Sequence, residues 1–150
     1  MKKNLLREFF FIALISVSIS LATIVVHELG HFFAGISEKC DPMKIILIDS
    51  YGMKTYTEME CPETKNLAIK ISFGGLFTGT LFALLFYIVP VTQDRYFSLI
   101  VLGFNFIISS YDLLSFIGYV GFSALILLGG FLITLGEVFI IDKKLFGEEK

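Results

Sequence analysis

The chain has 150 residues, of which 55% are hydrophobic and 15% aromatic, and its mean hydropathy is +0.80. This composition excludes an ordinary soluble domain and predicts an integral membrane protein. The formal net charge of −2 provides no basic surface of the kind that binds nucleic acid. We expect one unit over residues 1–150, an all-α polytopic membrane protein. It would be a bundle of about four transmembrane helices with a small β-hairpin between the first and second.

The first predicted span covers about residues 9–36. Residues 9–26 carry no charge, and this run is close to the ~20 residues that cross a bilayer core. A signal peptide is the competing interpretation, because basic residues precede the apolar run. The run is long and lacks an A-x-A-like cleavage site, so we favour a span that continues directly into the sequence HELGH.

The sequence HELGH at residues 27–31 contains both histidines of the chain. Positions i and i+4 of a helix share one face, so His27 and His31 can direct their imidazoles at one metal ion. Two neutral imidazoles suit zinc. Glu28 faces away from direct ligation but is near enough to act on a water bound to the metal. The motif therefore predicts a zinc site, with an adjacent general base, inside the membrane or just within one interface.

A hairpin is predicted in the polar segment that follows, over about residues 43–60. Residues 43–49 are rich in Ile and Leu, and residues 53–60 alternate in the manner of a strand. An isolated hairpin is marginal in water, so we expect it to lean on the bundle or on the membrane surface. Cys40 and Cys61 flank it, and the sequence is equally compatible with a disulfide across its base and with two free thiols.

Three further spans are expected, at about residues 69–91, 96–115 and 118–141. The second of the four predicted spans opens with a glycine-rich stretch. Gly75 and Gly79 form a G-x-x-x-G pattern there, which lets helix backbones approach closely in lipid. A span thinned in this way can pack tightly against the helix that carries the histidines.

The next span contains Asn105 and Asp112, which share one helix face. An ionisable residue inside a span is costly and indicates a functional site by default. Catalytic zinc takes three protein ligands and leaves one position for water. Asp112 is the carboxylate deep in an apolar segment, whereas Glu137 is expected at the membrane interface. We therefore predict that one zinc ion per chain is held by His27, His31 and Asp112.

Taken together, these features resemble the site-2 protease family of intramembrane zinc metalloproteases. The resemblance covers about residues 10–115. It rests on HELGH at the end of a first span, a hairpin, the glycine-rich sequence SFGGLFTG, and Asn105 and Asp112 on a later span. The chain departs from the family's usual pattern at Gly75, where the family has proline, and at Thr78, where it has asparagine.

The resemblance implies an activity and a role for each of these residues. It implies a zinc endopeptidase that hydrolyses peptide bonds within or next to transmembrane segments of membrane-protein substrates. Glu28 would activate a zinc-bound water, Asp112 would be the third ligand, and Asn105 would be a catalytic residue that stabilises the developing oxyanion. The hairpin would hold the substrate as an extended strand.

Two other interpretations remain open. Around Asp112, residues 106–111 lack the prolines of the family and Leu113 stands where the family has glycine. These departures are compatible with a catalytically silent zinc-binding relative that acts as a binding partner of membrane proteins. A metal-handling membrane protein is the third interpretation, although two histidines and few intramembrane carboxylates argue against an ion path with several sites. For all three we expect a multi-pass protein in contact with the lipid bilayer, in the cell membrane. For the peptidase we expect a membrane-protein substrate.

Overall fold

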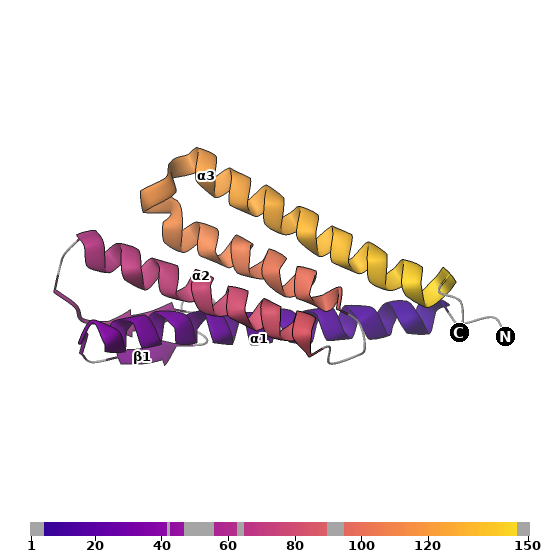
Figure 1. Cartoon of the computed structure of the whole chain (residues 1–150), viewed down its shortest axis with the longest axis horizontal. Helices are drawn as coiled ribbons and strands as arrows, with labels where there is room; N and C mark the ends of the chain where they lie inside the picture. The colour runs from indigo at the N-terminus through magenta and orange to yellow at the C-terminus, as the bar shows by residue number, and fades with distance from the viewer. Residues whose placement is uncertain (1–4, 42, 47–55, 63–64, 90–94, 147–150) are drawn as a thin grey trace.

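The long apolar segments of the chain form helices, and a two-stranded hairpin connects the first helix to the second (Figure 1). The computed structural model describes residues 5–41, 43–46, 56–62, 65–89 and 95–146. In chain order the elements are α1 (Leu5–Ser37), β1 (Met43–Ile46), β2 (Tyr56–Met59), α2 (Lys65–Ile88) and α3 (Phe97–Phe146). The expected helical membrane bundle, with a hairpin between its first two spans, is therefore confirmed.

The number of spans differs from the four expected, because the described residues contain three helices long and apolar enough to cross a membrane. At 50 residues, α3 would measure about 75 Å if straight, which is more than twice a bilayer core of ~30 Å. Gly118 interrupts this helix with a φ of 66°, a left-handed conformation that glycine adopts readily. Figure 1 shows α3 folding back on itself partway along its length, so that its yellow end returns toward the side where the helix begins. The spans expected at 96–115 and 118–141 are therefore two halves of one interrupted helix.

Both α1 and α2 begin about one turn before the expected first and second spans. Charged side chains are accommodated there because their heads reach partners at the ends of the bundle. Glu8 pairs with Lys144 near the end of α3 at 3.2 Å, and Lys70 of α2 pairs with Glu38, just beyond α1, at 2.6 Å. Hydropathy marked the apolar part of each helix and missed the charged first turn of α1, whereas Lys70 lies within the span expected at residues 69–91.

Small side chains let the helix backbones approach one another. A Cβ atom on Gly74 would lie 2.6 Å from the carbonyl oxygen of Gly30, so α2 crosses α1 with the two backbones in contact. A Cβ atom on Gly103 would lie 2.5 Å from the carbonyl oxygen of Gly129, so the two halves of α3 also meet backbone to backbone. Close contact of this kind is how helices associate in lipid.

The apolar core lies where the three helices meet. Its fully packed members are Ile12, Ile19, Ala83, Phe97, Ile100, Val101 and Ile140. Large apolar side chains also cover the outer faces of the bundle, among them Phe10, Leu14 and Leu127. Such faces are stable in a bilayer because lipid tails are as apolar as the side chains themselves.

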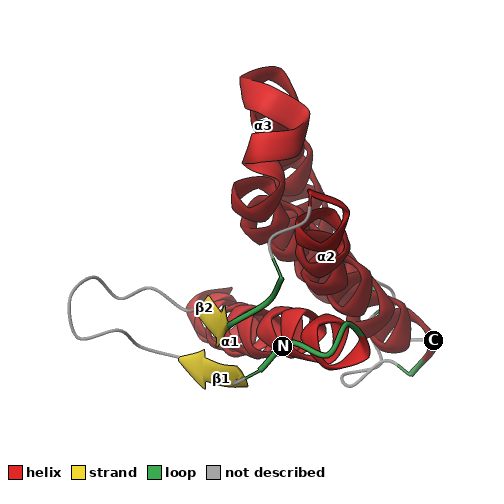
Figure 2. Ribbon diagram, turned by 90° about the vertical axis from the view of Figure 1, so that its left-hand side faces the viewer, coloured by secondary structure: helices red, strands yellow, loops and turns green. Residues whose placement is uncertain are grey.

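The hairpin is antiparallel, with Met43 opposite Met59 and Ile46 opposite Tyr56. It agrees with the hairpin expected over residues 43–60, whose turn lies outside the described residues. Both strands contact α1, and Figure 2 shows them beside that helix. The hairpin therefore leans on the bundle, as the sequence predicts.

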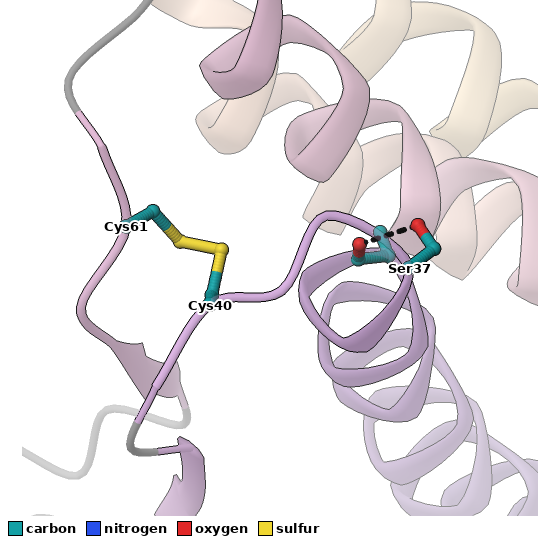
Figure 3. Close-up of a disulfide and its surroundings, with 4 residues drawn as sticks. Ser37, Cys40 and Cys61 are labelled. Carbon is teal, nitrogen blue, oxygen red and sulfur yellow. Dashed lines mark hydrogen bonds between the residues drawn. A yellow bond between two sulfur atoms is a disulfide. The ribbon is translucent and has the colours of Figure 1, made fainter.

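A disulfide between Cys40 and Cys61 closes the base of the hairpin (Figure 3). Cys40 lies shortly after the end of α1, and Cys61 lies shortly after β2. Beside the bridge, the backbone N–H of Asp41 donates to the carbonyl oxygen of Glu60 at 2.9 Å. Of the two alternatives that the sequence allows for the cysteines, the structure contains the bridge. It ties β2 to the end of α1.

Candidate metal centre

The three predicted ligands come together between α1 and α3. His27 and His31 lie one turn apart on α1, and Asp112 reaches them from α3. The Oδ2 atom of Asp112 is 2.7 Å from His27 Nε2 and 3.2 Å from His31 Nε2, and the two Nε2 atoms are 3.1 Å apart. Both rings are buried, while the Asp112 side chain is 31% exposed. This group could hold a metal ion.

Hydrogen bonds on the far side of each ring set its tautomer. His31 Nδ1 lies 2.7 Å from the carbonyl oxygen of Ile71, and a carbonyl can only accept, so this nitrogen carries the proton. His27 Nδ1 donates to Asn105 Oδ1 at 3.0 Å. The amide of Asn105 is itself oriented, because its Nδ2 donates to the carbonyl oxygen of Leu76 at 2.9 Å. A neutral ring protonated at Nδ1 presents a lone pair at Nε2.

The centre of the group is therefore rich in electron pairs. Two imidazole nitrogens and one carboxylate oxygen face each other at 2.7 to 3.2 Å, an arrangement that is stable only with a proton on a ring nitrogen or with a metal ion among the three atoms. Ligands about 2.0–2.2 Å from a tetrahedral zinc ion lie about 3.3 Å from one another. To reach that spacing, Asp112 Oδ2 and His27 Nε2 need to separate by about 0.6 Å and the other two pairs by about 0.1–0.2 Å. The residues present thus fit a zinc ion in charge, chemistry and size.

The glycines of α2 make room for the ligands. A Cβ atom on Gly75 would lie 2.5 Å from His27 Nε2 and 2.7 Å from His31 Nε2. A Cβ atom on Gly79 would overlap the side-chain amide of Asn105. The predicted G-x-x-x-G pattern is therefore a packing surface that contacts the rings of His27 and His31 and the side-chain amide of Asn105.

Glu28 shares a cavity with the exposed side of the ligand group. The cavity has a volume of about 490 Å³ and lies between β2 and the first turns of α2. Glu28, His31 and Asp112 are its ionisable lining residues, and together they are called its polar floor. Its other lining residues are Tyr56, Thr57, Met59, Cys61, Pro62, Leu67, Ala68, Ile71 and Ser72. A small polar molecule in this cavity has access both to the ligand group and to the Glu28 carboxylate.

Asn105 lies elsewhere than its predicted catalytic role requires. Its side chain is fully buried and is not part of the cavity lining. Both ends of its amide are already engaged, with His27 on one side and with α2 on the other. The amide therefore lies apart from the cavity, and the catalytic role of Asn105 stays a prediction that this geometry does not support. Asn105 orients His27 from behind, as the partners of metal-binding histidines commonly do.

Two contacts at the site were absent from the sequence-based prediction. The hydroxyl of Thr57, on β2, donates to Glu28 Oε2 at 2.8 Å, and the carbonyl oxygen of Ile71 orients His31. The position of Thr57 in an alternating strand gave only a weak indication that its side chain faces the bundle. No sequence feature indicates the contact of the Ile71 carbonyl oxygen. Among the described residues the candidate metal group consists of the three predicted ligands, and Glu137 is not one of them.

Comparisons of the chain with family models, with curated proteins and with solved structures found no match. Its function is therefore inferred from the residues and geometry of the site.

Proposed function

We propose that the protein is an intramembrane zinc endopeptidase similar to the site-2 proteases. It hydrolyses peptide bonds within or next to transmembrane segments of membrane-protein substrates. The observation that carries this proposal is the arrangement of Glu28, which opens onto the same cavity as a donor set of two histidines and one aspartate. Three protein ligands with one accessible side are typical of catalytic zinc, whereas structural zinc is enclosed by four.

Each residue of the site has a distinct task in this proposal. A bound zinc ion would polarise the scissile carbonyl and bring the pKa of a coordinated water to ~7. Glu28 accepts the proton of the attacking water and returns it to the leaving amine. Asp112 balances the charge of the ion, and the hydrogen bonds to the two Nδ1 atoms keep both rings aimed at it.

The cavity walls support a membrane-protein substrate. Apolar side chains from β2 and α2 surround the polar floor, including Met59, Leu67 and Ile71. They would accommodate the side chains of a transmembrane segment. That segment must be unwound locally, because an intact helix hides its carbonyl groups in its own hydrogen bonds. Water would reach the site from the side of the hairpin, and we place the protein in the cell membrane.

The test combines zinc content with cleavage of a model transmembrane substrate by the purified protein. Glu28→Gln should retain zinc and lose cleavage, whereas Asp112→Ala should lose both. Glu137→Gln is the matched control, because this carboxylate lies on the same helix as Asp112 but outside the ligand group. It should behave as wild type.

Three results would contradict the proposal. Full zinc content and full activity in Asp112→Ala would show that Asp112 is not the third zinc ligand. Zinc binding by wild type without any cleavage would favour the silent relative. Zinc flux in liposomes that Glu28→Gln leaves unchanged would favour a metal-handling protein.

A further inference from the structure

In the described part of the hairpin, the side chain of Thr57 hydrogen-bonds to Glu28 beside the candidate metal site. Burial alternates along β2, so Thr57 and Met59 are half-buried while Glu58 is exposed. The Thr57 hydroxyl lies 2.8 Å from Glu28 Oε2 and 3.1 Å from the Glu28 carbonyl oxygen. A hydroxyl has a single proton, and the shorter distance and the charge of the acceptor favour the carboxylate.

Few other interactions fix the orientation of the Glu28 carboxylate. Glu28 is only 5% exposed, so its carboxylate meets water mainly within the cavity that it shares with the ligand group. Within the described part of the chain, Thr57 is the only side chain that hydrogen-bonds to this carboxylate. Charge-assisted hydrogen bonds of this kind are stronger than neutral ones. The orientation of the carboxylate therefore depends on the position of β2.

We propose that Thr57 is a positioning residue for the Glu28 general base. This inference rests on the proposed peptidase function. Donation to Oε2 holds one carboxylate oxygen and leaves Oε1 to accept the proton of the attacking water. The water oxygen then bonds to the scissile carbonyl carbon. When the C–N bond breaks, the proton passes from Oε1 to the leaving nitrogen, so Glu28 ends as it began.

The disulfide supports this role because it anchors the strand that carries Thr57. Cys61 lies four residues beyond Thr57 and is bonded to Cys40 at the end of α1. The strand is thus held to α1 at two points, by the bridge and by the Thr57–Glu28 hydrogen bond. A general base must be placed within hydrogen-bond reach of the proton it removes, so rigid attachment of its partner is of direct use.

The experiment compares wild type with Thr57→Val, which removes the hydroxyl, and with Thr57→Ser, which keeps it. Thr134→Val is the matched control, because the Thr134 hydroxyl donates to the Gly130 carbonyl oxygen of its own helix, its one hydrogen-bond partner among the described residues. For Thr57→Val we expect kcat to fall about 10- to 100-fold, with KM and zinc content within about twofold of wild type. Thr57→Ser should recover most of kcat, and Thr134→Val should match wild type.

A second measurement does not depend on catalysis. The unfolding equilibrium of zinc-free protein in mixed micelles is measured for Thr57→Val, for Glu28→Gln and for the double variant. If the two side chains interact, the combined effect departs from the product of the single effects by about twofold or more. A double variant whose effect equals that product overturns the contact.

The kinetic results separate this inference from the function on which it rests. A wild-type kcat in Thr57→Val overturns the positioning role alone, and so does a loss of kcat that Thr57→Ser shares equally. A loss of kcat that follows loss of zinc also overturns it, because Thr57 would then support the metal site. If wild type binds zinc but cleaves nothing, the peptidase function fails and this inference fails with it.

Discussion

Replacing Gly75 by alanine tests whether α2 is shaped to fit the rings of His27 and His31, the proposed metal ligands. The new methyl group would lie 2.5 Å from His27 Nε2 and 2.7 Å from His31 Nε2. An ordinary non-bonded contact needs about 3.4 Å or more, so the rings or the helix must shift by about 0.9 Å. Metal–ligand distances tolerate only about 0.2 Å. The substitution therefore displaces both histidine ligands beyond the range in which they can share one ion.

We expect Gly75→Ala to weaken zinc binding by about 100-fold or more, because even changes behind a ligand cost about 10- to 100-fold. The assay is competition between the purified protein and a chromophoric chelator. Gly130→Ala is the control, since a Cβ atom on Gly130 would meet nothing within 4 Å. Alanine is more favourable in a helix than glycine by about 0.8–1 kcal/mol. Helix propensity therefore cannot explain a loss of zinc affinity that occurs in Gly75→Ala but not in Gly130→Ala. Equal zinc affinities in both variants would refute this account of α2.

Three further predictions concern the surroundings of the site. Asn105→Ala should weaken zinc binding about 10- to 100-fold in the chelator assay, because the neighbouring ring loses its orienting acceptor; unchanged affinity would return Asn105 to a packing role. Cys40→Ser with Cys61→Ser should lower the free energy of unfolding by about 3 kcal/mol, since the bridge closes a loop with a sequence separation of 21. Equal thermal unfolding of this variant and oxidised wild type would contradict that. Gly118→Ala should cost about 1–3 kcal/mol because of the left-handed backbone there, measured against Gly130→Ala as the relaxed control. A stabilising effect at Gly118 would show that the turn in α3 tolerates a side chain.

The parts of the site that a local pattern encodes could be predicted. His27 and His31 lie together because helix geometry alone places i and i+4 on one face. Asp112 could be identified because a carboxylate inside an apolar span is costly without a partner. The disulfide could not be decided, since two cysteines flanking a hairpin fit either redox state.

The remaining contacts depend on how the elements pack. Asn105 shares a helix face with Asp112, but the pattern did not show that it lies behind a ring and away from the cavity. Thr57 meets Glu28 across a separation of 29 residues, for which no spacing rule exists. The helix count differs slightly from the expected four, because the last two expected spans form one helix that is interrupted at Gly118. Gly118 reverses the chain with a single residue, whereas apolar runs of this length usually imply a loop between spans.

The bridge between Cys40 and Cys61 also determines the covalent connectivity of the chain around the hairpin. A backbone cut between β1 and β2 leaves α1 with β1 in one fragment and β2 with the other helices in the second. The disulfide keeps these fragments joined until a reductant is added. A protease site inserted between the strands would therefore report which side of the membrane carries the hairpin, by a nick visible only on a reducing gel. The nicked protein would still hold Thr57 within reach of Glu28.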